Sequence, residues 1–188
     1  MKRLFVTNIL ISCLFLTLAS LSAGMDQSEQ DRFWLGVKMF PPIVGGDLDL
    51  ETKLGSDGKL LLLIVYKNNR PLADNVVSSL RSMVSNISER PVRIVATSDL
   101  SFKDYQAVKV AGIFISEQFT PNSLHPIVCF GIKRQLVVFS PFIGDVQKGV
   151  FAGIYISTQI KPAFNLTTIN KSGIHMNKLF YKVAQTYD

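Results

Sequence analysis

One run of apolar residues constrains the fold of this chain more than any other feature. Residues 60–66 read LLLLIVY, and the run lies between Gly58 and the pair Asn68-Asn69. A strand with no polar residue on either face is typical of the centre of a parallel sheet that helices cover on both sides. The run therefore predicts an α/β domain.

The rest of the chain alternates between strand and helix patterns. Further strands are expected at residues 92–96, 110–115 and 136–139, and helices at residues 28–40, from Pro71 onward and from residue 122 or 123 onward. This alternation predicts a single three-layer domain, in which a mostly parallel sheet is flanked by helices.

The two ends of the domain give more specific expectations. Pro41 and Pro42 are expected to end the first helix, because proline lacks the backbone N–H that a helix interior needs. Near the C-terminus, residues 150–156 and 160–164 predict an antiparallel strand pair. Apolar residues at helical spacing from Met176 to Tyr187 predict a long last helix.

The first 24 residues have the order of an export signal. Lys2 and Arg3 precede a mainly apolar stretch over residues 4–18, and small residues gather at positions 19–24. This order is typical of a signal peptide, so the sequence predicts an exported, periplasmic protein with residues 25–188 as its domain. The pattern allows cleavage after Ser22 or after Gly24.

Two alternatives to simple cleavage stay open. The stretch is shorter than the roughly 20 apolar residues of a membrane-spanning helix and contains Asn8, which argues against an uncleaved anchor without excluding it. The sequence Leu10-Ile11-Ser12-Cys13 resembles the lipid-attachment box of bacterial lipoproteins, so lipidation of Cys13 is the second alternative.

Charge and cysteine content exclude several classes of protein. The 188 residues include 20 basic and 14 acidic side chains, and no basic run is longer than two residues, so no nucleic-acid-binding surface is expected. Cys13 and Cys129 are the two cysteines. Once the signal is removed, no disulfide can form within the chain, and the domain depends on its apolar core.

No pattern for catalysis, a cofactor or a metal ion is evident. The chain has neither of the glycine-rich nucleotide motifs and no G-x-S-x-G elbow, and His125 and His175 lie far apart in the sequence. Cys129 lies next to the apolar face of a predicted helix and is expected to be a buried, inert thiol. The sequence therefore predicts a protein that is not an enzyme and holds no cofactor or metal.

Polar residues follow each strand of the predicted parallel sheet. Ligands of such sheets bind at the carboxyl ends of the strands, so these residues form a candidate binding edge. The positive charges of Lys67 and Arg70 favour a small anionic ligand. The candidate ligand-binding residues are Lys67, Asn68, Asn69, Arg70, Ser98, Asp99, Ser116, Glu117 and Ser140.

The second half of the chain carries a family resemblance. The segments that carry it are Glu89-Arg90-Pro91-Val92 before a strand, Gly112-Ile113-Phe114-Ile115-Ser116, the strands Leu136-Val137-Val138-Phe139-Ser140 and Gly149-Val150-Phe151-Ala152-Gly153-Ile154, Phe164-Asn165-Leu166 before a short helix, and the turn Lys171-Ser172-Gly173-Ile174 before a terminal apolar helix. With these segments, residues 89–186 resemble the YfiR-like family of bacterial periplasmic regulators. Ala152-Gly153 stands where the family usually has two glycines, and Cys129 lacks the partner that some members have.

The resemblance implies a periplasmic regulator that acts by protein contact. Members of the family dock on the periplasmic part of an inner-membrane diguanylate cyclase and hold it inactive, which lowers cyclic di-GMP and biofilm formation. Such docking needs an exposed apolar patch, and the candidate contact residues are Phe33, Trp34, Phe119 and Phe142. The alternative function is a periplasmic module that binds a small anionic ligand. The sequence leaves open whether the protein is a homodimer.

Overall fold

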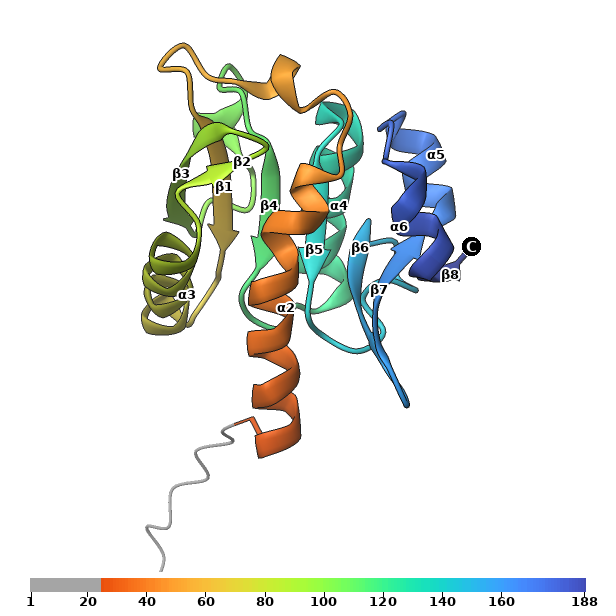
Figure 1. Cartoon of the computed structure of the whole chain (residues 1–188). Helices are drawn as coiled ribbons and strands as arrows, with labels where there is room; N and C mark the ends of the chain where they lie inside the picture. Colours follow the sequence, from red (N-terminus) through yellow and green to blue (C-terminus); the bar gives the residue numbers. More distant parts are fainter. Residues whose placement is uncertain (1–24) are drawn as a thin grey trace, which may run out of the picture.

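An eight-stranded sheet with the order β2-β3-β1-β4-β5-β6-β7-β8 runs through the whole domain (Figure 1). It is seen in a computed structural model that describes residues 25–188, and the predicted signal peptide lies outside the described residues. The strands are β1 (Leu60–Val65), β2 (Asn86–Ile87), β3 (Arg90–Thr97), β4 (Gly112–Ile115), β5 (Val137–Ser140), β6 (Ala152–Ile156), β7 (Ile160–Asn165) and β8 (Gln185–Tyr187).

The helices cover both faces of this sheet. They are α2 (Gln27–Gly45), α3 (Arg70–Met83), α4 (Pro121–Arg134), α5 (Leu166–Ser172) and α6 (Lys178–Val183), with short 3₁₀ helices η1 (Leu50–Lys53) and η2 (Lys103–Tyr105). Helix α2 packs against α3 and the sheet, while α4 packs against β5 and α5; in Figure 1, α2 lies in front of the sheet and α4 behind it. The predicted three-layer α/β domain is confirmed.

Strand β1 lies at the centre of the parallel part of the sheet. It pairs in parallel with β3 on one side and with β4 on the other, and all six of its residues are buried. The apolar run therefore forms the doubly covered strand that its composition predicts.

The strand order reverses at β1. The chain leaves β1 through α3 to reach β3 on one side, then returns past β1 to β4 and continues through α4 to β5 and β6 on the other side. Strands β3, β1, β4, β5 and β6 are all parallel, so their carboxyl ends meet at one edge. A reversal of this kind is where open α/β sheets form a crevice for ligands.

The end of the chain differs in part from expectation. Strands β6 and β7 form the predicted antiparallel pair, with Ile156 opposite Ile160. The long last helix is wrong, because α6 has only six residues and residues 185–187 form β8, which pairs in parallel with β7. Ala184 is extended (φ −82°, ψ 155°), and pairing of the following residues with β7 supplies backbone hydrogen bonds that a longer helix would otherwise give.

Helix α2 does not stop at its prolines. It includes Pro41 and Pro42 and ends at Gly45, so the predicted end at these residues is wrong. The last turn buries Ile43 and Val44, which are 2% and 0% exposed. Burying two such side chains contributes roughly 1.5–3 kcal/mol each, which offsets the two helix hydrogen bonds that the prolines cannot donate.

We predict that Gly36→Ala weakens the contact between α2 and the loop after β5. A Cβ atom at position 36 would lie 2.7 Å from Cβ of Pro141, whose ring cannot move aside. The free energy of unfolding should fall by about 1–3 kcal/mol in a urea titration. Lys38→Ala, on the exposed side of the same helix, is the matched control and should change it by less than about 0.5 kcal/mol. An unchanged midpoint in Gly36→Ala would show that the helix shifts freely.

Candidate functional site

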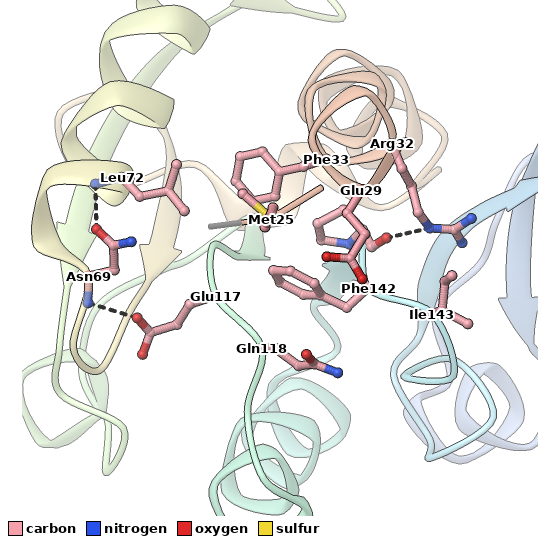
Figure 2. Close-up of a pocket in the computed structure, with 11 residues that line it drawn as sticks. Met25, Glu29, Arg32, Phe33, Asn69, Leu72, Glu117, Gln118, Phe142 and Ile143 are labelled. Atoms are coloured by element: carbon pink, nitrogen blue, oxygen red, sulfur yellow. Dashed lines mark hydrogen bonds between the residues drawn. The ribbon is translucent and has the colours of Figure 1, made fainter. Parts of the chain in front are cut away.

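A pocket of about 370 Å³ lies at the carboxyl ends of β1, β4 and β5, where the strand order reverses (Figure 2). The turn after β1, the turn after β4, the loop after β5 and the start of α2 surround it. The lining residues are Met25, Glu29, Arg32, Phe33, Asn69, Leu72, Glu117, Gln118, Pro141, Phe142 and Ile143.

One face of α2 forms a wall of this pocket. Glu29, Arg32 and Phe33 are spaced i, i+3 and i+4, so they lie on the same side of the helix. The side chain of Asp26 caps the helix by accepting a hydrogen bond from the backbone N–H of Glu29 at 2.7 Å. Phe33 anchors this face to the sheet through an edge-on contact with Phe114, with ring centroids 5.8 Å apart.

Arg32 joins this wall to the loop after β5 and to β6. Its Nε donates to the carbonyl of Pro141 at 2.8 Å, and its Nη2 donates to the carbonyl of Ile154 in β6. Burial lowers the pKa of the guanidinium, and the phenol of Tyr187 opposes this shift. An arginine stays protonated in proteins, so this position carries a positive charge.

The charge of Arg32 is not neutralised within the described residues. No carboxylate in residues 25–188 forms an ion pair with it, and its two hydrogen bonds go to neutral carbonyls. A guanidinium has five N–H donors, so three remain after these two bonds. Arg32 can therefore bind an anionic group that enters the pocket.

Glu117 closes the floor of the pocket with an unusual set of contacts. Its Oε1 accepts hydrogen bonds from the backbone N–H groups of Lys67 and Asn68 at 2.7 and 2.8 Å, and its Oε2 accepts one from Asn69 at 2.7 Å. Backbone N–H groups at this position of an α/β sheet commonly hold the phosphate of a ligand. Here a carboxylate of the protein takes that place, and it ties the turn after β1 to the turn after β4.

The structure brings the predicted binding edge together but leaves few of its side chains free. Asn69 and Glu117 line the pocket. Asn69 also caps α3, where its side chain accepts from the backbone N–H of Leu72 at 3.0 Å (Figure 2). Ser116 and Ser140 are fully buried; Ser116 donates to the carbonyl of Val65 at 2.9 Å and Ser140 donates to Asp145 at 2.7 Å.

The predicted cationic residues lie outside the pocket. Arg70 forms an exposed ion pair with Asp74 at 3.5 Å, one turn along α3. Nζ of Lys67 lies 3.4 Å from the hydroxyl of Ser123, and only the backbone of Lys67 contacts Glu117. The positive charge at the pocket therefore comes from Arg32 rather than from these two side chains.

The loop after β3 also uses its polar residues internally. Asp99 accepts hydrogen bonds from the hydroxyl and the backbone N–H of Ser101, and the hydroxyl contact holds the pKa of this carboxyl below its usual range. Ser98 is exposed, and neither Ser98 nor Asp99 lines the pocket between α2 and β4.

The four aromatic residues predicted to contact a partner have different environments. Phe33 and Phe119 are only 1% and 5% exposed, so they pack inside the domain and present little surface of their own. Trp34 is half-buried and contacts the ring of Phe33 at a centroid distance of 5.3 Å. Phe142 is half-buried and lines the pocket.

Sequence reasoning missed the residues that α2 brings to the pocket. Glu29 and Arg32 lie more than 30 positions before the first strand end, and their spacing with Phe33 is the one signal that could have placed them on the inward face. Nothing local in the sequence indicates that the loop after β5 reaches this pocket, because Pro141 and Ile143 come close to α2 only in the folded domain.

Comparisons with known proteins add little about function. No family model matches the sequence, and the comparison with curated proteins gives no significant match. Among solved structures, the chain is similar to an ABC domain in complex with L-Trp from Streptococcus pneumonia, at 12% sequence identity and a TM-score of 0.48. The match covers 77% of this chain and 62% of that chain, so less than two thirds of that protein is represented.

Across residues 25–188, no helix has the length and apolar character needed to cross a bilayer. Within the same range, no three or more His, Cys, Asp and Glu side chains gather closely enough to hold a metal ion. Cys129 is exposed, so its predicted burial is wrong. The buried face of α4 includes Ile127, Val128 and Phe130, which turns Cys129 to the solvent side.

We predict that Glu117→Ala destabilises the domain, because it leaves three backbone N–H groups without their carboxylate. The expected loss is about 1–2 kcal/mol in the free energy of unfolding, as for removal of a helix-capping side chain. The control is Glu51→Ala, which removes an exposed carboxylate paired with Arg90 and should cost less than about 1 kcal/mol. Equal losses in the two variants would contradict a special role for Glu117.

Proposed function

We propose that this protein is an exported, non-enzymatic binding protein that takes a small ligand into the pocket between α2 and the ends of β1 and β4. The observation that carries the proposal is the guanidinium of Arg32, which lines this pocket and has no carboxylate partner among residues 25–188. A volume of about 370 Å³ is that of a site for a small molecule.

The lining suggests the chemistry of the ligand. An anionic group would bind Arg32, and an apolar body would pack against Phe33, Leu72 and Phe142. Glu29 also lines the pocket, and its carboxylate has no hydrogen-bond partner within the described chain. It would therefore accept a donor group of the ligand. The ligand we expect is a small, partly apolar molecule with one anionic group and at least one hydrogen-bond donor.

We further propose that ligand binding serves regulation in the periplasm. The resemblance to the YfiR-like family supports contact with an inner-membrane sensor, of which a diguanylate cyclase is the most specific candidate. Ile143, Ile156 and Ile160 supply an apolar surface for such contact, since they are 68%, 40% and 53% exposed. Ile156 and Ile160 belong to the β6–β7 hairpin, and Arg32 donates a hydrogen bond to the carbonyl of Ile154 in this hairpin. A ligand that binds Arg32 would therefore change the position of this apolar surface.

The ligand-binding proposal predicts a specific pattern of thermal shifts. A panel of aliphatic and aromatic carboxylic acids should include at least one that raises the melting temperature of the protein, because a ligand at 100 times its Kd stabilises by about 2.7 kcal/mol. Arg32→Ala and Glu29→Ala should each reduce the shift. Arg70→Ala is the control and should keep it, because Arg70 does not line the pocket.

The Glu29 variant protects this test against a simple folding defect. Arg32→Ala removes hydrogen bonds to two backbone carbonyls, whereas Glu29→Ala removes no internal side-chain hydrogen bond in the described chain. A full thermal shift in both variants would contradict ligand binding at this pocket.

The regulatory proposal predicts the effect of charge on the hairpin. The double variant Ile156→Asp, Ile160→Asp should lose crosslinked capture of an inner-membrane protein in the native host and should raise cyclic di-GMP, as deletion of the gene should. Leu48→Asp, at an exposed apolar position (66% exposed) outside the hairpin, is the matched control. Unchanged cyclic di-GMP after deletion would contradict regulation of a cyclase.

A further inference from the structure

Helix α2 places two opposite charges side by side on the wall of the ligand pocket. Glu29 and Arg32 are spaced i and i+3, and both line the pocket. Side chains at this spacing are neighbours, with Cβ atoms about 5–6 Å apart, and a carboxylate and a guanidinium placed in this way commonly pair. Among the ion pairs of residues 25–188, however, none joins Glu29 to Arg32.

Contacts to the rest of the domain explain why these two residues stay apart. Arg32 donates from Nε to the carbonyl of Pro141 at 2.8 Å and from Nη2 to the carbonyl of Ile154, which directs its guanidinium toward the loop after β5 and toward β6 (Figure 2). The carboxylate of Glu29 is exposed and accepts no hydrogen bond from any group of the described chain. The pocket is therefore lined by an anion and a cation that do not neutralise each other.

The second carboxylate of the pocket is already bound. Glu117 accepts hydrogen bonds from the backbone N–H groups of residues 67, 68 and 69 at 2.7–2.8 Å. A cationic group of a ligand would have to compete with these three donors at Glu117, whereas it would meet no internal competitor at Glu29. Glu29 is therefore the carboxylate that a ligand can use.

The surroundings of the two charges are mainly apolar. The side chains of Met25, Phe33, Leu72, Phe142 and Ile143 line the same volume of about 370 Å³. A ligand with an apolar body would displace water from these side chains and from the two charges between them. A charge that loses water needs an opposite charge in its place. A ligand with a single charge would leave either Glu29 or Arg32 without a counterion.

We propose that the ligand of this pocket is a zwitterion with an apolar side chain, namely an apolar α-amino acid. Its carboxylate binds the remaining N–H groups of Arg32, its ammonium binds Glu29, and its side chain packs against Phe33, Leu72 and Phe142. Both charged groups of an α-amino acid are attached to one carbon atom, which suits two side chains one helical turn apart. This inference rests on the proposed ligand-binding function and names the class of ligand for the same pocket.

The test compares ligands that differ by one charged group. Phenylalanine, hydrocinnamate and phenethylamine share an aromatic body and carry both charges, the carboxylate alone and the ammonium alone. Leucine, isocaproate and isoamylamine form the same set with an aliphatic body. Thermal-shift titrations of the purified protein give the Kd of each compound. In at least one set, the amino acid should bind at least about tenfold more tightly than the acid and the amine, because each lacks one charge-assisted hydrogen bond.

Glu29→Gln distinguishes an ammonium from a neutral donor group. Glutamine still accepts a hydrogen bond but carries no charge, so this variant should weaken binding of the amino acid about tenfold and should not weaken binding of the acid. Asp31→Asn is the matched control, since it removes the same charge from the same helix. Asp31 accepts a hydrogen bond from Gln27 at 2.9 Å and does not line the pocket, so this variant should bind the amino acid as the wild type does.

The outcomes separate this inference from the function on which it rests. An acid that binds as tightly as its amino acid, or a Glu29→Gln variant with wild-type affinity for the amino acid, would overturn the zwitterion and leave a pocket for anions. The same conclusion follows if an acid raises the melting temperature and neither amino acid does. If no acid and no amino acid raises it, both the inference and the proposed function are overturned.

Discussion

Complete burial of β1 is the constraint on which the rest of this structure depends. Its six apolar residues leave no face for solvent, so the strand needs a parallel neighbour on each side and a helix layer on each face. Because β1 is the first strand along the chain, both neighbours follow it. The chain therefore goes to β3 on one side and then returns past β1 to β4 on the other side. The reversal of strand order, and the pocket that it opens at the carboxyl ends, both follow from that requirement.

Much of the fold could be predicted because its signals are local and repeated. The apolar run, the strand–helix alternation and the β6–β7 pair each follow from periodicity within a few residues. The errors arise where distant contacts outweigh local preference. Burial of Ile43 and Val44 carries α2 past two prolines, and pairing with β7 turns residues 185–187 from helix into strand.

The candidate site was predictable in position but not in composition. Parallel strands bring their carboxyl ends to one edge, which the sequence indicates, and Asn69 and Glu117 do lie at the pocket there. The sequence does not indicate that Glu117 is held by three backbone N–H groups or that Ser116 and Ser140 bond inside the domain. It also gives no local reason for Arg32 to supply the charge, because the loop after β5 and α2 meet only through tertiary packing.

The short strand β8 has a consequence for how this domain avoids self-association. On the outer side of β7, Ala163, Phe164 and Asn165 pair with residues 185–187, whereas the exposed Ile160 lies beyond that pairing. Without β8, the N–H and C=O groups of these three residues would form an open edge, which is the arrangement from which sheets extend into other molecules. Residues 185–187 therefore cover this part of β7 and make β8 the edge strand of the sheet, and an edge of only three residues offers little backbone for another strand to pair with.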